Sequence, residues 1–160
     1  MALANLTPID WAKRPIEKYA DFSGRAPRAE YWWYTLAVLC TAIVVGIVEG
    51  IVGLNNMVGP YGPLSLLLML GLLVPGLAVT VRRLHDTNRS GWWILIAVVP
   101  YLIVGVMMGM AASSGSMTGM AELGVFGIVA LVGAIVLLVF MVLAGTPGDN
   151  QYGPNPYGAT

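Results

Sequence analysis

The side chains with the greatest chemical capability lie in one short charged segment, residues 82–91. It contains two adjacent arginines, a histidine, a carboxylate and a third arginine: Arg82, Arg83, His85, Asp86 and Arg89. A guanidinium group binds a phosphate or a carboxylate through two parallel hydrogen bonds. The segment therefore favours a site for an anionic lipid headgroup or an acidic partner. The same charges could instead form structural ion pairs or set the orientation of the chain in a membrane.

Catalysis or metal binding would need more groups than this segment supplies. His85 is the single histidine of the chain and Cys40 its single cysteine, which argues against a metal cluster and against a disulfide framework. The sequence contains no H-E-x-x-H motif, no nucleophile elbow and no glycine-rich phosphate loop. We expect no catalytic residue, no metal and no cofactor. An enzyme that acts on lipid headgroups with His85 as its base is the least favoured hypothesis.

Two further polar segments carry candidate binding residues. The first segment precedes the first apolar run and contains Arg25 and Arg28. The second follows the last apolar run and contains Asp149, Asn150 and Tyr152. The second segment is the tail at residues 145–160, which is rich in glycine and proline. Because these residues favour turns, we expect the tail to contain neither helix nor strand. Asp149 could pair with the arginines of residues 82–91 if the two segments meet.

These polar segments must be positioned by helices in a membrane. Hydrophobic residues make up 58% of the 160 residues and charged residues 10%, whereas soluble domains carry about 25% charged residues. Four runs are long and apolar enough to cross a bilayer as helices; they cover residues 31–54, 64–81, 92–110 and 123–144. The sequence predicts an all-α membrane protein with an N-terminal arm at 1–26, a four-helix domain at 27–144 and the tail.

The N-terminal arm is expected to lie in the plane of the lipid headgroups. Ile9, Ala12, Ile16 and Tyr19 recur at helical spacing opposite charged residues, which is typical of an amphipathic interfacial helix. Pro15 lacks the amide hydrogen that a continuous helix needs. The arm is therefore predicted to form two short helical pieces, the second beginning at Pro15.

The basic residues indicate how the four spans are oriented. All eight lysines and arginines lie within residues 13–28 and 82–89, and the loops at 55–63 and 111–122 have none. Cytoplasmic loops of membrane proteins carry an excess of lysine and arginine, so we expect both termini and the segment 82–91 to be cytoplasmic. Acidic and basic residues are equal in number, eight each, which argues against nucleic acid as a partner.

Two features on the opposite side allow more than one interpretation. Glu49 lies near the end of the first span, where an interfacial carboxylate is favoured over an intramembrane proton relay. The methionines between residues 107 and 120 could suggest a site for a soft metal, but no histidine or cysteine accompanies them. Flexible apolar filling is the favoured explanation.

The order of the motifs resembles one known family. Phe22-x-Gly24-Arg25-x-x-Arg28-x-Glu30-Tyr31-Trp32 is followed by Arg82-Arg83-Leu84-His85-Asp86-x-x-x-Ser90-Gly91-Trp92-Trp93 and then by Gly148-x-Asn150-x-Tyr152-Gly153-x-x-Pro156. This series resembles the domain-of-unknown-function family 805, which consists of small bacterial inner-membrane proteins. The resemblance implies a helical membrane domain and no known activity. It also implies that the family motifs include Arg25, Arg28, Arg83, His85, Asp86, Asn150 and Tyr152.

Together these observations predict a non-catalytic, multi-pass protein of the bacterial inner membrane. We expect an accessory or scaffold subunit of a membrane complex, with a cytoplasmic-face site for anionic lipid headgroups or an acidic partner. The expected partners are membrane lipids and either other membrane proteins or further copies of the chain. The alternative is a small transporter or channel subunit. That function would require oligomerisation, because four spans without a buried polar pair leave little to line a path.

Overall fold

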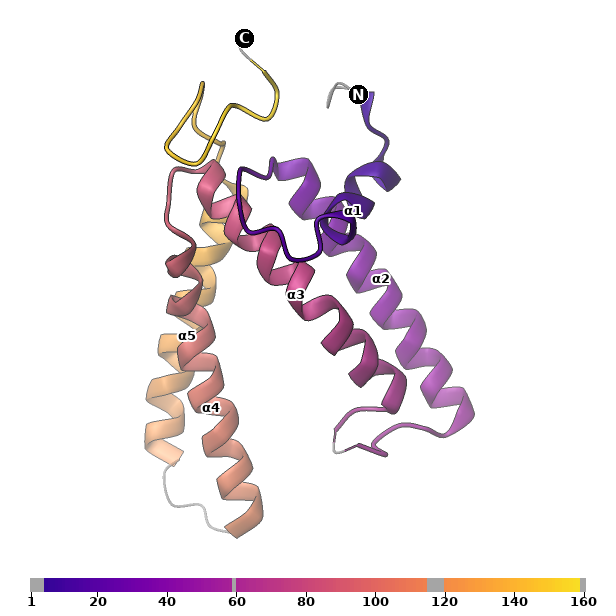
Figure 1. Ribbon diagram of the computed structural model, residues 1–160. Coiled ribbons are helices and arrows are strands. Elements are labelled where there is room, and N and C mark those ends of the chain that lie inside the picture. The colour runs from indigo at the N-terminus through magenta and orange to yellow at the C-terminus, as the bar shows by residue number, and fades with distance from the viewer. Residues whose placement is uncertain (1–4, 59, 115–119, 159–160) are drawn as a thin grey trace.

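Helices are the main regular elements of the chain. The computed structural model describes residues 5–58, 60–114 and 120–158 (Figure 1). The elements are α1 (Pro8–Glu17), α2 (Arg28–Val52), α3 (Pro63–Asp86), the short 3-10 helix η2 (Gly91–Ile94), α4 (Leu95–Ser114) and α5 (Met120–Val142). Four segments of the described chain are long and apolar enough to cross a membrane, namely Arg28–Val52, Pro63–Asp86, Gly91–Ala111 and Leu123–Val142. The predicted all-helical fold with four candidate spans is confirmed.

The long helices form two hairpins that meet at one end of the molecule. α2 packs with α3, and α4 packs with α5. Figure 1 shows both chain ends beside the meeting point, from which the two hairpins diverge. We call this meeting point the basic end, because the segments that contain all eight lysines and arginines, residues 13–28 and 82–89, lie there.

The distribution of buried residues is the reverse of that in a soluble protein. Arg82, Arg83 and Glu30 are each 0% exposed. Apolar side chains of the long helices instead face outward, and Ile51 is 81% exposed. Lipid can cover such apolar surfaces, whereas charged groups at membrane depth are stable when they face protein partners. The buried contacts at the basic end therefore include charged groups, beside apolar side chains such as Leu84 and Met141.

α3 is longer than the sequence predicted. The second span was expected to end at residue 81, but α3 continues to Asp86. Arg82 and Arg83 are therefore helical and do not lie in a loop. Their guanidinium groups find buried partners, described below, and cations near a helix C-terminus interact favourably with its negative end. The connection to η2 is reduced to residues 87–90, within which Asn88 adopts a left-handed conformation with φ of 57°.

The N-terminal arm forms one helix, so the predicted division at Pro15 is wrong. α1 begins with a reciprocal cap: the hydroxyl of Thr7 accepts from the backbone N–H of Asp10, and the carboxylate of Asp10 accepts from the backbone N–H of Thr7. Pro15 lies in the last turn, where its missing amide removes a single hydrogen bond before the helix ends at Glu17. α1 packs on α2 and contributes the buried side chain of Trp11.

Glu49 caps α3 at the end of the molecule opposite the basic end. Its Oε1 accepts hydrogen bonds from the backbone N–H groups of Leu64, at 2.6 Å, and Ser65, at 3.0 Å. Its Oε2 accepts one from the Ser65 hydroxyl. Free amide groups at a helix N-terminus favour a negatively charged partner. The carboxylate therefore joins α2 to α3 at the loop end of this hairpin. The methionine-rich segment 107–120 includes residues 115–119, which lie outside the described residues.

Candidate functional site

Glu30 is the centre of the first of two buried groups of ion pairs at the basic end. It lies in the first turn of α2. Its Oε1 accepts a hydrogen bond from Nη2 of Arg82 at 2.9 Å, and its Oε2 accepts one from Nε of Arg14 at 3.1 Å. Arg82 also donates to the backbone carbonyl of Asp21. One carboxylate therefore joins α1, α2 and α3.

Asp86, the last residue of α3, is the centre of the second group. Its Oδ1 accepts from Nε of Arg25 at 3.0 Å, and its Oδ2 accepts from Arg83. All three side chains are buried. Removal of charges from water is costly unless each charge has a close partner and further hydrogen bonds. The two guanidinium groups around one carboxylate leave an excess of positive charge at this place.

Arg83 and Arg28 bind the last carbonyl groups of α5. Nε of Arg83 donates to the carbonyl of Met141 at 3.3 Å, and a second nitrogen of the same side chain donates to that of Leu143. Nη1 of Arg28 donates to the carbonyl of Val142 at 3.2 Å. The last carbonyls of a helix lack partners within the helix and carry partial negative charge. These two arginines therefore join the α2–α3 hairpin to the α4–α5 hairpin.

The tail folds over the end of α3. Nη1 and Nη2 of Arg25 donate to the carbonyls of Gly148 and Thr146, both at 2.7 Å. The side-chain amide of Asn150 donates to the carbonyl of His85 at 2.9 Å. The tail thus consists of turns, as its composition predicted, and these turns have defined partners in the rest of the chain.

His85 provides a docking surface for the tail. Its ring stacks on the ring of Tyr152, with centroids 3.9 Å apart and planes inclined by 2°. Its Nδ1 lies 3.2 Å from the carbonyl oxygen of Gly24, which can only accept, so we assign the imidazole proton to Nδ1. Asp149 accepts from the backbone N–H of Asn155 at 2.9 Å. Asp149 forms no ion pair with an arginine in the part of the chain that the structure describes.

A polar pocket of about 220 Å³ opens between the start of α2, the end of α3 and the tail. Arg28 is exposed there, and no carboxylate of the described chain pairs with it. Partial burial, and secondarily the charge of Asp86, raises the pKa of Tyr157 further above neutrality, and its phenol carries its O–H at neutral pH, as tyrosines ordinarily do. The pocket therefore offers guanidinium and hydroxyl donors to an anion of the size of a phosphate group. Its lining consists of Arg25, Arg28, Asp86, Ala144, Gly145, Thr146, Pro147, Asn155 and Tyr157.

The structure divides the ten predicted site residues among several places. Arg25, Arg28 and Asp86 line the pocket and Arg83 binds Asp86 beside it, while His85, Asn150 and Tyr152 form the neighbouring tail contact. The remaining three lie elsewhere: Arg82 pairs with Glu30, Arg89 lies 4.2 Å from the ring centroid of Phe140, and Asp149 lies in the tail turn.

Sequence reasoning missed three residues that matter at the basic end, namely Glu30, Arg14 and Tyr157. Glu30 carries a signal that could have identified it, because a carboxylate in the first turn of an apolar helix needs a partner. Nothing in the local sequence around Arg14 or Tyr157 indicates their contacts, since both depend on segments distant in the chain.

The fold and its clustered arginines define a multi-pass integral membrane protein. The family described as "Protein of unknown function (DUF805)" matches residues 19–154, and the chain belongs to that family. The resemblance inferred from the motifs of residues 22–156 is thus confirmed.

Two of the relatives are named as inner-membrane proteins. "Inner membrane protein YhaI" of Escherichia coli K12 is 34% identical over 148 residues, which cover 92% of this chain and 96% of the relative. "Inner membrane protein YhaH" of the same bacterium is 30% identical over 148 residues, with 92% and 97% covered. "Uncharacterized protein YiiR" is 26% identical over 134 residues, with 83% and 84% covered. No solved structure matches the chain. The chain is therefore an integral inner-membrane protein.

Proposed function

We propose that the chain is a non-catalytic accessory or scaffold subunit of an inner-membrane complex and that its polar pocket binds the phosphate of an anionic lipid headgroup. The observation that carries this proposal is Arg28, an exposed guanidinium group without a carboxylate partner among the described residues. Arg25 lines the same pocket but is engaged by Asp86. Arg28 is therefore the cation that the pocket offers to a ligand.

The level of the pocket relative to the membrane favours a lipid headgroup over an acidic protein surface as its ligand. Trp32, one turn from Arg28 in α2, is 38% exposed, and Trp92 at the start of η2 is 77% exposed. Tryptophan is enriched at the membrane–water interface, at the level of the lipid headgroups. A pocket at that level meets lipid phosphates without any further partner.

The proposal includes an orientation with both termini and the pocket on the cytoplasmic side. Its support is the position of all eight lysines and arginines at the basic end, together with the excess of such residues in cytoplasmic loops. Anionic lipids of the cytoplasmic leaflet would then face Arg28.

The buried polar groups support binding in preference to catalysis. A general base must reach the proton that it removes. Glu30 and Asp86 each accept hydrogen bonds from two arginines, and His85 is stacked on Tyr152. A transporter with Glu49 as a proton relay also loses support, because that carboxylate caps α3.

Substitution of Arg28 tests the headgroup site. Hydrogen bonds to charged groups contribute about 1.5–3 kcal/mol, so we expect Arg28→Ala to weaken binding of phosphatidylglycerol to the detergent-purified chain by about tenfold or more, as measured by native mass spectrometry. Lys13→Ala removes an exposed charge from α1 and serves as the matched control. Equal binding by Arg28→Ala and the wild type would contradict the proposal.

The accessory role is tested by gentle extraction of the chain from its own membrane. We expect a second protein to co-purify in stoichiometric amount and to remain bound during native mass spectrometry. Extraction of the chain alone, under conditions that preserve known complexes of the same membrane, would contradict the accessory role while leaving the headgroup site intact.

A further inference from the structure

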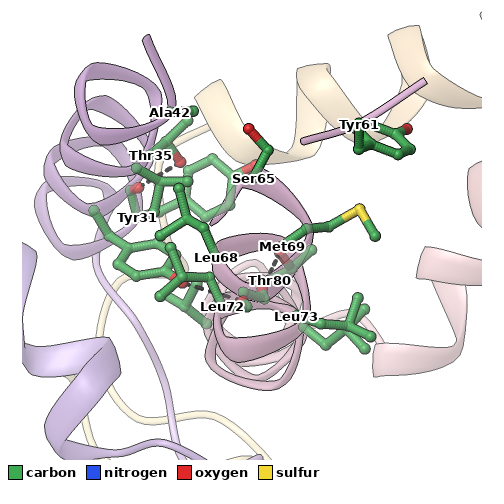
Figure 2. A pocket seen from close by; sticks show the side chains of 15 residues that line it. Tyr31, Thr35, Ala42, Tyr61, Ser65, Leu68, Met69, Leu72, Leu73 and Thr80 are labelled. Carbon is green, nitrogen blue, oxygen red and sulfur yellow. Dashed lines mark hydrogen bonds between the residues drawn. The ribbon is translucent and has the colours of Figure 1, made fainter. Parts of the chain in front are cut away.

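An apolar groove runs between α2 and α3. It is an open cavity of about 650 Å³, and Figure 2 shows side chains of both helices around it. α2 contributes Tyr31, Thr35, Val38 and Ala42, and α3 contributes side chains between residues 65 and 80. Binding sites for small molecules have volumes of about 300–1,000 Å³. The groove is therefore large enough for an extended ligand.

Three of the hydroxyl groups in the groove donate to backbone carbonyls of the protein. The hydroxyl of Tyr34 donates to the carbonyl of Leu72 at 3.3 Å. Thr35 donates to its own helix, to the carbonyl of Tyr31 at 2.8 Å, and Thr80 likewise donates to that of Gly76 at 2.7 Å. Hydroxyls satisfied in this way leave mainly carbon surface toward a ligand. The chemistry of the groove therefore fits a hydrocarbon chain.

The groove is long enough for an acyl chain of one leaflet of a bilayer, since its lining on α3 runs from Ser65 to Thr80, about 22 Å at 1.5 Å per residue. From Tyr31 to Ala42 the groove follows α2 for a distance of about 16 Å at 1.5 Å per residue. The hydrocarbon core of a bilayer is about 30 Å thick, so each leaflet supplies about half of that. A lipid of the leaflet at the basic end has an acyl chain of the corresponding reach.

Positive charges lie directly beyond the end of this groove. Arg28 precedes Tyr31 by three residues, and Arg83 follows Thr80 by three residues. Residues three apart in a helix lie on the same face about one turn apart. The apolar groove thus leads to the arginines that bind the end of α5, and Arg28 also lines the polar pocket.

We infer that the groove and the polar pocket together hold one anionic phospholipid, with an acyl chain between α2 and α3 and its phosphate at Arg28. The inference rests on the headgroup site proposed above and adds a site for the acyl chain of the lipid. Such a lipid would lie between α2 and α3, with its phosphate near the point where the two hairpins meet, and would act as a structural ligand of the fold.

A pair of matched substitutions on α2 tests the acyl-chain site. Ala42 lines the groove, whereas Ala37 is also exposed but lies outside it. The larger side chain of Ala42→Phe would displace about two methylene groups of the lipid's acyl chain from the groove. This substitution is therefore expected to weaken phosphatidylglycerol binding about tenfold. Ala37→Phe should bind as the wild type does.

The outcomes separate the groove from the headgroup site. Full binding by Ala42→Phe, with loss of binding by Arg28→Ala, would overturn the groove and leave the proposed headgroup site standing. Loss by Ala42→Phe with full binding by Arg28→Ala would overturn the phosphate site, and with it this combined inference. Loss by both substitutions, with retention by Ala37→Phe, supports the inference.

A second measurement uses the unmodified sequence and so does not depend on the folding of a variant. The chain is placed in phosphatidylethanolamine vesicles that contain phosphatidylglycerol with a diazirine on one acyl chain. After illumination, we expect Val38 and Leu72 in the groove to be labelled several-fold more than Leu36 and Leu67, which lie outside it. Equal labelling of all four positions would indicate ordinary surrounding lipid and overturn the inference.

Discussion

Nε of Arg25 donates a 3.0 Å hydrogen bond to Oδ1 of Asp86 across 61 residues of chain. The two terminal nitrogens of the same guanidinium group bind the tail carbonyls of Gly148 and Thr146. One buried side chain therefore connects the segment before α2, the end of α3 and the tail. The guanidinium nitrogens of Arg25 are all bonded to groups of the protein, so this arginine is a structural link. Arg28 is the residue that a ligand can reach.

Loss of this link should lower the stability of the whole basic end. We expect Arg25→Ala to reduce the free energy of unfolding by about 3 kcal/mol, the lower end of the range for a broken buried pair, because Arg83 still pairs with Asp86. Unfolding in detergent, followed by circular dichroism, measures the change. Lys13→Ala, a surface substitution, should stay within about 0.5 kcal/mol of the wild type. A loss for Arg25→Ala no larger than this control would show that the link is not structural.

The cap that Glu49 forms on α3 predicts opposite changes in stability for alanine substitutions at two glycines. A Cβ atom added at Gly62 would lie 2.2 Å from Cδ of Glu49, whereas one added at Gly46 meets nothing within 4 Å. Gly62→Ala should therefore displace the carboxylate from α3 and lower the midpoint of thermal unfolding by several degrees. Gly46→Ala replaces glycine in a helix interior and should stabilise by up to about 1 kcal/mol. The same unfolding experiment measures both, and an unchanged or raised midpoint for Gly62→Ala would contradict the cap.

The helices were predictable because their signal is local. Length and apolarity identify each span, whatever the rest of the chain does. The end of α3 was not predictable in this way. Arg82 and Arg83 look like loop residues until Glu30, Asp86 and the end of α5 supply partners that let them stay helical. The sequence carries those partners but not their proximity.

The site was predictable only in part, for a related reason. Arg83 and Asp86 are three residues apart on one helix, a spacing at which opposite charges meet. The contact between Arg25 and Asp86, and the stack of Tyr152 on His85, join segments that no local pattern relates. Motif resemblance could mark these residues as a set, but it could not say which were buried against one another.

The stacking of Tyr152 in the tail on His85 of α3 predicts that the tail is protected from proteolysis. Tyr152 contributes its ring to the contact with His85, and stacked aromatic pairs contribute about 0.5–1.5 kcal/mol beyond their area burial. We expect Tyr152→Ala to increase the rate of proteolytic cleavage within residues 145–158 several-fold. Tyr152→Phe retains the ring and should be cleaved at the wild-type rate. If both variants were cleaved like the wild type, the stack would not hold the tail.

The orientation proposed for the chain can be read from two single cysteines. Cys40 is the natural cysteine and lies in α2, so its replacement by serine gives a background without thiols. Met57, in the connection between α2 and α3, is 65% exposed, and Gln151 in the tail is also exposed.

In intact bacteria, a membrane-impermeant maleimide should label Met57→Cys. It should label Gln151→Cys after the inner membrane is opened and not before. This result is expected from the charge distribution, because cytoplasmic segments of membrane proteins carry an excess of lysine and arginine. The reverse labelling pattern would place Arg28 and its pocket outside the cytoplasm and would remove the cytoplasmic-leaflet lipids from its reach.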